Sequence, residues 1–206
     1  HATATGYEGA RYPWESALDG TEQIPPPAYE NSEGIYEQHI TADVALAQWQ
    51  YYLATGAKRW LARRGWPVIS QAANFWASRV TPGSGASYHI DAVTGPDEDN
   101  PDVNDEVYTD AAAATTLEDA ISAATVLHRH APAAWTTIAT HLVVPVDNGL
   151  GIHPEFSGYL GQIVKQADVT LLQYPLGYPM PANLELNDLN YCLLYTSPSP
   201  RDRQKS

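Results

Sequence analysis

The chain of 206 residues is strongly acidic, with 24 Asp and Glu residues against 11 Lys and Arg and a formal net charge of -13. This charge argues against binding to nucleic acid or to an anionic membrane, because both reward Lys and Arg. No apolar run in the sequence is long enough to span a bilayer, so we expect a soluble protein.

The two ends of the chain are treated separately from its middle. The chain begins at His1 without an initiator Met or an apolar signal segment, so we expect the first residue to lie inside a larger protein, and the cellular location stays open. Residues 192–206, CLLYTSPSPRDRQKS, hold the only Cys and three of the eleven basic residues, and they resemble a translated sequencing adapter. We therefore expect residues 1–191 to be a fragment with the length of one domain, without disulfides or thiolate metal sites.

Hydrophobic periodicity predicts helical hairpins in the first half of the chain. A first helix is expected over residues 37–54, ending at Gly56, and Pro67 can open a second helix that runs to Val80. The short connection between Gly56 and Trp66 would place these two helices antiparallel.

The same period predicts further helices beyond a long loop. We expect a third helix over residues 106–127 and a fourth that follows Pro132 and stops before Pro145. Shorter helical stretches are plausible at residues 165–173 and 184–191. Strand signals are weak and limited to pieces such as residues 88–93.

The loop before the third helix carries a dense group of acids. Residues 80–127 contain no Lys or Arg, and eight carboxylates crowd into a short span: Asp91, Asp97, Glu98, Asp99, Asp102, Asp105, Glu106 and Asp110. Like charges at this density push a carboxyl pKa upward, and a proton donor for glycoside cleavage needs a raised pKa. The alternative is an ordinary solvated acidic surface.

A second long loop, residues 146–164, contains His153, Glu155, Phe156 and Tyr159. If the helices alternate in direction, both long loops emerge at the same end of the bundle. A cleft lined by acids, aromatic rings and His would suit a sugar.

Five blocks of sequence, in order, resemble the catalytic domain of glycoside hydrolase family 65. They are GARYPWES at residues 9–16, EQHIT from Glu37, FWASRV at 75–80, GPDE through VYT at 95–109, and VKQADVTLLQYP at 164–175. The resemblance covers nearly all of residues 6–191. It implies an all-α fold, here a partial (α/α)6 barrel built of antiparallel helical hairpins.

The resemblance also implies roles for individual residues. Glu98 matches the general acid, while Lys165 and Gln166 match a pair that contacts the transferred glucose. Trp14 and Glu15 match the wall of the sugar pocket. Lys165 could instead be an ordinary surface lysine and Trp14 could merely pack a loop. Further candidates for substrate binding are His39, Asp97 and His153, and no metal or cofactor is expected.

The implied reaction is inverting cleavage of an α-linked glucosyl disaccharide, such as trehalose, kojibiose or a glucosyl-galactose unit. KQADVTLLQYP looks closer to the hydrolases of the family than to its phosphorylases, which release β-glucose 1-phosphate. The segment that decides between water and phosphate is expected just beyond Tyr191. Asp99 stands where many relatives have an aromatic residue, which leaves the identity of the disaccharide open.

Two rival interpretations fail on the sequence. A calcium-binding hand loop counted from Asp97 needs Gly at its sixth position and Glu at its twelfth, but Asp102 and Tyr108 stand there. A non-catalytic repeat scaffold would show self-similar repeats, and none is found.

Overall fold

The computed structural model describes residues 2–16, 18–24 and 36–192 and shows a mainly helical protein with few strands. The predicted adapter-derived tail, residues 192–206, lies outside the described residues except for Cys192. The α-helices are α1 Ile40–Thr55, α2 Lys58–Trp60, α3 Trp66–Arg79, α4 Val107–Leu127, α5 Ala133–His141 and α6 Ala182–Tyr191. Short 3-10 turns cover Ala2–Thr5, Ser84–Ala86 and Asp168–Leu172.

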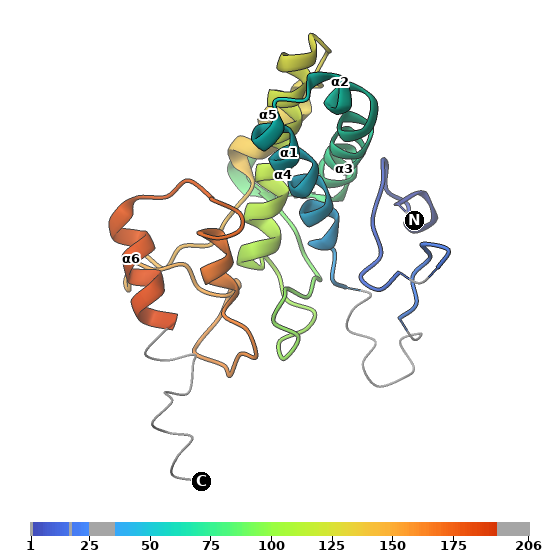
Figure 1. Cartoon of the computed structure of the whole chain (residues 1–206). Helices are drawn as coiled ribbons and strands as arrows, with labels where there is room; N and C mark the ends of the chain where they lie inside the picture. Colours follow the sequence, from blue (N-terminus) through green and yellow to red (C-terminus); the bar gives the residue numbers. More distant parts are fainter. Residues whose placement is uncertain (1, 17, 25–35, 193–206) are drawn as a thin grey trace, which may run out of the picture.

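Helix α4 is the centre of the fold, and α1, α3 and α5 pack against it. Figure 1 shows this group together, with α6 to one side of it and the N-terminal segment on the other. The helical hairpins predicted from the sequence are therefore present. Closure into a six-hairpin barrel stays a prediction.

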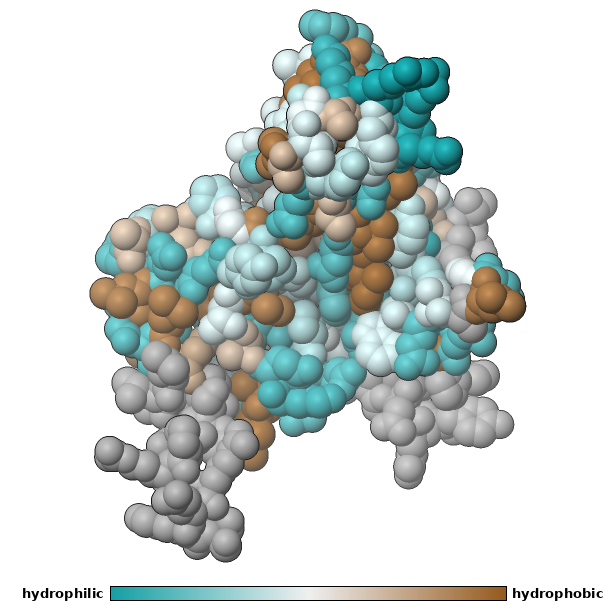
Figure 2. All heavy atoms as spheres, viewed as in Figure 1, coloured by the Kyte–Doolittle hydropathy of each residue, from teal (hydrophilic) through white to brown (hydrophobic). Residues whose placement is uncertain are grey.

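Apolar side chains remain on the surface of this arrangement, and Figure 2 shows them in brown among the teal hydrophilic residues. The large exposed ones include Tyr51, Leu53, Leu150, Leu160, Ile163, Tyr174 and Leu186. Among the described residues, no helix combines the length and the apolar character that crossing a membrane requires.

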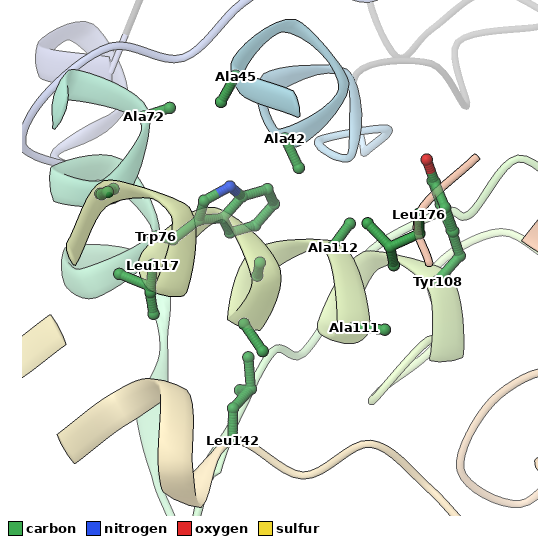
Figure 3. Packing of buried hydrophobic residues seen from close by; sticks show 14 of the residues in the cluster. Ala42, Ala45, Ala72, Trp76, Tyr108, Ala111, Ala112, Leu117, Leu142 and Leu176 are labelled. Atoms are coloured by element: carbon green, nitrogen blue, oxygen red, sulfur yellow. The ribbon is translucent and has the colours of Figure 1, made fainter. Parts of the chain in front are cut away.

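The packing around α4 depends on small residues. Ala111, Ala112 and Ala113 follow one another on α4 and are all buried, so this helix is covered on several faces at once. Figure 3 shows the Trp76 ring of α3 filling the space between α4 and the alanines Ala42 and Ala45 of α1. The small alanine side chains let the helix axes approach closely, and the Trp76 ring fills the space that the alanines leave.

The predicted start of the second helix at Pro67 is wrong, because the chain is already helical from Lys58, and the connection that follows Gly56 is short, as predicted. Gly56 ends α1 in the left-handed conformation, as expected, but α2 begins at Lys58 and leads through a π-helical turn, Leu61–Gly65, directly into α3. Pro67 has no N–H to donate to the preceding turn. The residue before it, Trp66, donates its N–H to the carbonyl of Leu61, five residues back, and this bond defines the π turn. The wider turn lets a helix continue past a proline that would otherwise end it.

The remaining elements match their predictions in place but not always in type. The third and fourth helices appear as α4 and α5. Residues 165–173, expected to be helical, form only the 3-10 turn Asp168–Leu172, and the helix expected at 184–191 begins earlier, at Ala182. The weak strand signal corresponds to β2, Tyr88–His89, which pairs antiparallel with β1, Thr81–Pro82.

The N-terminal segment that carries Trp14 is docked on α3 through Gly9. Gly9 has a φ of +71°, and a Cβ built on it would lie 2.1 Å from the Gln71 carbonyl oxygen and 2.7 Å from the Phe75 nitrogen. The next residue, Ala10, donates its N–H to the same carbonyl at 3.0 Å. This close contact between two main chains tolerates no side chain.

We expect Gly9→Ala to lower the free energy of unfolding by roughly 3 to 5 kcal/mol, because left-handed strain adds to a main-chain clash. Gly6 is the matched control: its φ is +84° and nothing lies within 4 Å of an added Cβ. Gly6→Ala should cost only about 1 to 2 kcal/mol. Urea denaturation of both variants measures the difference, and equal losses would show that Gly9 makes no tight contact.

Candidate active site

Glu98 and Lys165 are brought into direct contact although they lie 67 residues apart. Glu98 stands on the acidic loop, and Lys165 stands on the segment before the 3-10 turn. The Lys165 ammonium donates to Glu98 Oε2, and this hydrogen bond raises the pKa of Lys165. Both side chains remain partly open to solvent, with exposed fractions of 51% for Lys165 and 31% for Glu98. The structure thus brings two of the residues named as candidates together in an accessible ion pair.

The prediction that both long loops meet at one end of the bundle is confirmed by main-chain contacts. Glu106 and Phe156 form an antiparallel bridge, and Val107 N–H donates to the Glu155 carbonyl at 3.0 Å. The acidic loop and the loop of residues 146–164 therefore adjoin each other at the N-terminal end of α4.

Glu37 is a further carboxylate at this place, which was not predicted from the sequence. Residues Glu37 and Thr94 form a parallel bridge, and Thr94 N–H donates to the Tyr36 carbonyl at 3.2 Å. The pKa of Glu37 is raised overall, mainly by burial and also by the nearby charge of Glu98. Hydrogen bonds from His39 and from the Trp14 side chain act in the opposite direction. Glu37 therefore lies among three of the residues that were predicted for the site. The EQHIT block was the available signal, but it was used only for His39.

His39 is buried, with 7% of its surface exposed, and lies between two acids. Its Nδ1 is 3.1 Å from Asp43 Oδ2, and its Nε2 is 3.5 Å from Glu37 Oε2. Burial alone would lower the pKa of His39, but the hydrogen bonds to Asp43 and Glu37 outweigh it and raise the pKa to about 9. At neutral pH His39 is therefore a buried imidazolium, so its most direct role is to hold these acids in place.

A pocket of about 410 Å³ opens beside this histidine. The Tyr108 hydroxyl donates to Asp43 Oδ1 at 2.6 Å and closes the polar side of the pocket. Its other walls are mostly apolar, and the lining residues are His39, Asp43, Leu46, Ala47, Gln50, Pro96, Tyr108, Leu171 and Pro175. Pro96 connects the pocket to the loop that carries Glu98.

Behind Glu98 lies a group of buried acids: Asp97, Glu106, Glu155 and Asp168, none more than 3% exposed. Burial raises the pKa of Glu155 to about 8, with the charge of Glu106 adding to the effect and the N–H groups of Val169 and Asp168 opposing it. Burial also raises the pKa of Asp168 and of Glu106. The crowding of acids noted in the sequence thus acts on these buried carboxyls, whereas Glu98 has a cation beside it from outside the loop.

The other predicted site residues have different environments. His153 is 3% exposed and pairs with the fully buried Asp188 of α6, with 2.8 Å between Nδ1 and Oδ2. Glu15 and Gln166 are exposed. The Trp14 and Glu15 N–H groups donate to the Glu22 carboxylate, which fixes the backbone of this segment. These contacts place His153 at the junction with α6.

A Ser, His and Asp chain also occurs, outside this site. Ser87 Oγ lies 3.0 Å from His89 Nε2, and His89 Nδ1 lies 2.9 Å from Asp105 Oδ1. The Ser87 hydroxyl is also 2.9 Å from the Ser84 carbonyl, which competes with His89 for its single proton. This chain of contacts ties the β1–β2 hairpin to Asp105 of the acidic loop. Within the described parts of the chain, no group of three or more His, Cys, Asp or Glu side chains could hold a metal ion.

Comparison with known proteins identifies the family. Residues 1–162 match the glycosyl hydrolase family 65 central catalytic domain. The chain belongs to glycoside hydrolase family 65. The resemblance found in the five sequence blocks is thereby confirmed.

Several family 65 relatives are similar over most of this chain. A kojibiose hydrolase of Flavobacterium johnsoniae is 43% identical over 175 residues, covering 85% of this chain and 25% of that protein. A protein-glucosylgalactosylhydroxylysine glucosidase of Dictyostelium discoideum is 43% identical, covering 91% and 26%. A kojibiose phosphorylase of Halothermothrix orenii is 30% identical, covering 92% and 31%. The chain spans about a quarter of the length of the two hydrolytic relatives and is more similar to them than to this phosphorylase.

A solved structure, a putative kojibiose phosphorylase from human microbiome, has the same fold over this region. The TM-score is 0.66 at 16% identity, and the match covers 76% of this chain and 24% of that one. At this identity the likeness shows the fold alone, and it agrees with the helical architecture described above.

The raised pKa of His39 predicts a pH dependence of stability. The folded pKa of about 9 exceeds the usual histidine pKa of 6.5, so the stabilisation is complete below the lower pKa and is lost as pH rises through the higher one. Its upper limit is about 3 kcal/mol. We expect the difference in unfolding free energy between wild type and His39→Gln to shrink steadily between about pH 6 and about pH 10.

Urea titrations across this range measure that difference. The exposed His130 provides the control, since His130→Gln should leave stability unchanged at each pH. A wild-type advantage over His39→Gln that does not vary with pH would contradict a charged His39.

Proposed function

We propose that the chain carries the general-acid side of an inverting glycoside hydrolase that cleaves α-linked glucosyl disaccharides of the trehalose, kojibiose or glucosyl-galactose type. The observation that carries the proposal is the contact between Glu98 and Lys165. An acid that is partly exposed can reach a leaving oxygen, and a cation beside it can bind the hydroxyl groups of the same sugar. The two hydrolytic relatives, a kojibiose hydrolase and a glucosidase, support the substrate class.

The surrounding residues have distinct roles in this proposal. Glu98 protonates the glycosidic oxygen, and Lys165 with Gln166 holds the glucose that is released. Trp14 and Glu15 form one wall of the sugar pocket, where an aromatic ring packs on the apolar face of a pyranose. The paired His39 and His153 are bound to acids of the chain and support the walls from behind.

Inversion needs a second group on the opposite face of the sugar. In an inverting hydrolase this is a carboxylate that activates water, roughly 6.5 to 9.5 Å from the acid. Glu37 does not suit this role, because its side chain is 3% exposed and is held by His39. We assign the base to a part of the full-length protein other than the described residues, in the region that follows Tyr191 in family 65 chains.

A second part of the proposal concerns the barrel to which these helices belong. We propose that residues 1–191 form part of an (α/α)6 barrel, with the antiparallel hairpins around α4 as consecutive members of the ring. The chain's share of its relatives' length and the large apolar side chains on its surface support this.

A disaccharide phosphorylase is the alternative within the same family, and it would use the same acid with inorganic phosphate as the nucleophile. The greater similarity to the two hydrolytic relatives favours water.

In the full-length protein, we expect Glu98→Gln to lower kcat on kojibiose-type disaccharides by about 10²- to 10⁴-fold, because the amide cannot supply the proton. Cleavage of α-glucosyl fluoride should survive, since fluoride leaves without protonation. Glucose release measures both rates. Asp102→Asn, which changes an exposed acid of the same loop, should behave like wild type. A Glu98→Gln protein that keeps most of its disaccharide activity would refute the assignment.

The choice of nucleophile is tested by the products. With kojibiose or trehalose as substrate, we expect free glucose from both halves, with no glucose 1-phosphate, whether or not inorganic phosphate is added. Enzymatic assays for glucose and for glucose 1-phosphate separate the two reactions. Turnover that requires phosphate and yields glucose 1-phosphate would establish the phosphorylase instead.

A further inference from the structure

Asp97 precedes Glu98 in the chain but lies in a different environment. Only 3% of Asp97 is exposed, whereas the Glu98 side chain beside it is open to solvent. A carboxylate this deeply buried contacts the protein rather than a sugar in the cleft. Its hydrogen bonds therefore show what it does.

Both oxygens of Asp97 are occupied by donors of the chain. Oδ1 accepts the main-chain N–H of Lys165 at 2.6 Å and, at 3.4 Å, that of Gln166. Oδ2 accepts the side-chain amide of Asn100 at 2.6 Å. One carboxylate thus joins the turn that carries Glu98 to the segment that carries Lys165.

Asn100 ties the same two segments together a second time. Its Nδ2 donates to Asp97 Oδ2 and also to the Ile163 carbonyl at 2.9 Å. The turn from Asp97 to Asn100 is therefore closed across its base and anchored on residues 163–166. Glu98 stands at the top of this closed turn.

The main chain of Asp97 connects the turn to the core. Its N–H donates to Asp168 Oδ2 at 2.8 Å, and the Asp168 N–H donates to Glu155 Oε2 at 3.0 Å. The Glu155 carbonyl in turn accepts the N–H of Val107, the first residue of α4. An unbroken series of hydrogen bonds thus links the acid turn to the central helix.

Gly95 shows how little freedom this arrangement leaves. A Cβ at Gly95 would lie 2.5 Å from Asp168 Oδ2 and 2.5 Å from the carboxyl carbon of Glu106. The backbone at Gly95 therefore lies directly against the side chains of Asp168 and Glu106. These contacts restrict the start of the turn, as the hydrogen bonds of Asp97 and Asn100 restrict its base.

We infer that Asp97 is a positioning residue, which sets Glu98 and Lys165 at their working separation by binding the backbone of one segment and closing the turn of the other. The inference rests on the proposed role of Glu98 as general acid. It replaces the direct contact with sugar that the sequence suggested for Asp97. A displacement of about 1 Å of a catalytic group can cost about 10²-fold in rate, so such a residue strongly affects catalysis without touching the substrate.

Asp97→Asn tests the inference with almost no change in shape. The new Oδ1 can still accept the Lys165 N–H, but the new amide presents N–H to the N–H of Asn100, so the closure of the turn is lost. In the full-length protein, we expect kcat on a disaccharide to fall roughly 10- to 100-fold. With α-glucosyl fluoride, kcat should stay within about threefold of wild type, because that leaving group needs no proton.

The decisive readout is the ratio of the two kcat values. A ratio that falls at least about tenfold in Asp97→Asn supports the inference, and an unchanged ratio overturns it, whether both rates are kept or both are lost. Asp102→Asn is the matched control, since it removes an exposed loop acid at a φ of 55°, which Asn tolerates. Its ratio should equal that of wild type.

Asn100→Ala provides a second variant if Asp97→Asn fails to fold. It opens the same turn while keeping Asp97 and its bond to the Lys165 N–H, so the ratio should fall in the same direction by a smaller factor. Glu98→Gln distinguishes a failure of the proposed function from a failure of the role assigned to Asp97. If Glu98→Gln keeps its disaccharide activity, the proposed function fails, whereas if Glu98→Gln loses it and the ratio in Asp97→Asn is unchanged, only the role of Asp97 fails.

Discussion

The hydrogen bond from the Lys165 main chain to the buried Asp97 carboxylate is the constraint on which the site depends. It joins two segments that are far apart in the sequence and that have no regular secondary structure of their own. Loops of this length would otherwise sample many arrangements, at a cost of about 1 to 2 kcal/mol per residue to order. The partly buried bond to Lys165, together with the bonds through Asn100 and Asp168, contributes against that cost and favours one arrangement.

The same design explains why acids are buried behind the site. Asp168 accepts the N–H of Asp97 and Glu155 accepts the N–H of Asp168, so two of these acids satisfy main-chain donors of the segments around the site. Glu106 also caps α4, with Tyr108 N–H at 2.9 Å and Thr109 N–H at 2.7 Å, so the helix that forms the core also fixes the end of the acidic loop. Burial raises the pKa of all three acids, which means that some of this cluster holds protons near neutral pH and avoids the repulsion of three full charges.

Helices with clear terminal signals could be predicted from the sequence, and features that depend on distant partners could not. Gly56 ends α1 as its residue type indicates, and Pro132 immediately precedes α5. The π turn before Pro67 was missed, because a proline usually marks a break and only the packed structure shows that the helix continues. Within the site, Glu98 and Lys165 were found through family blocks. The role of Glu37 was not, since its bridge to Thr94 joins segments 57 residues apart and leaves no local pattern.

The acidic loop therefore combines two kinds of carboxylate that look alike in the sequence. Asp97 is buried and bonded through both oxygens, and its neighbour Glu98 is partly exposed and paired with Lys165. The distinction follows from the geometry of a tight turn, in which consecutive side chains point to different sides. Because the inner carboxylate, Asp97, is held by the protein, the outer carboxylate, Glu98, can be exposed to solvent and still keep a defined position. Since a general acid must be both accessible and accurately placed, the alternation of buried and open acids is the property of this loop that suits it to protonate a glycosidic oxygen.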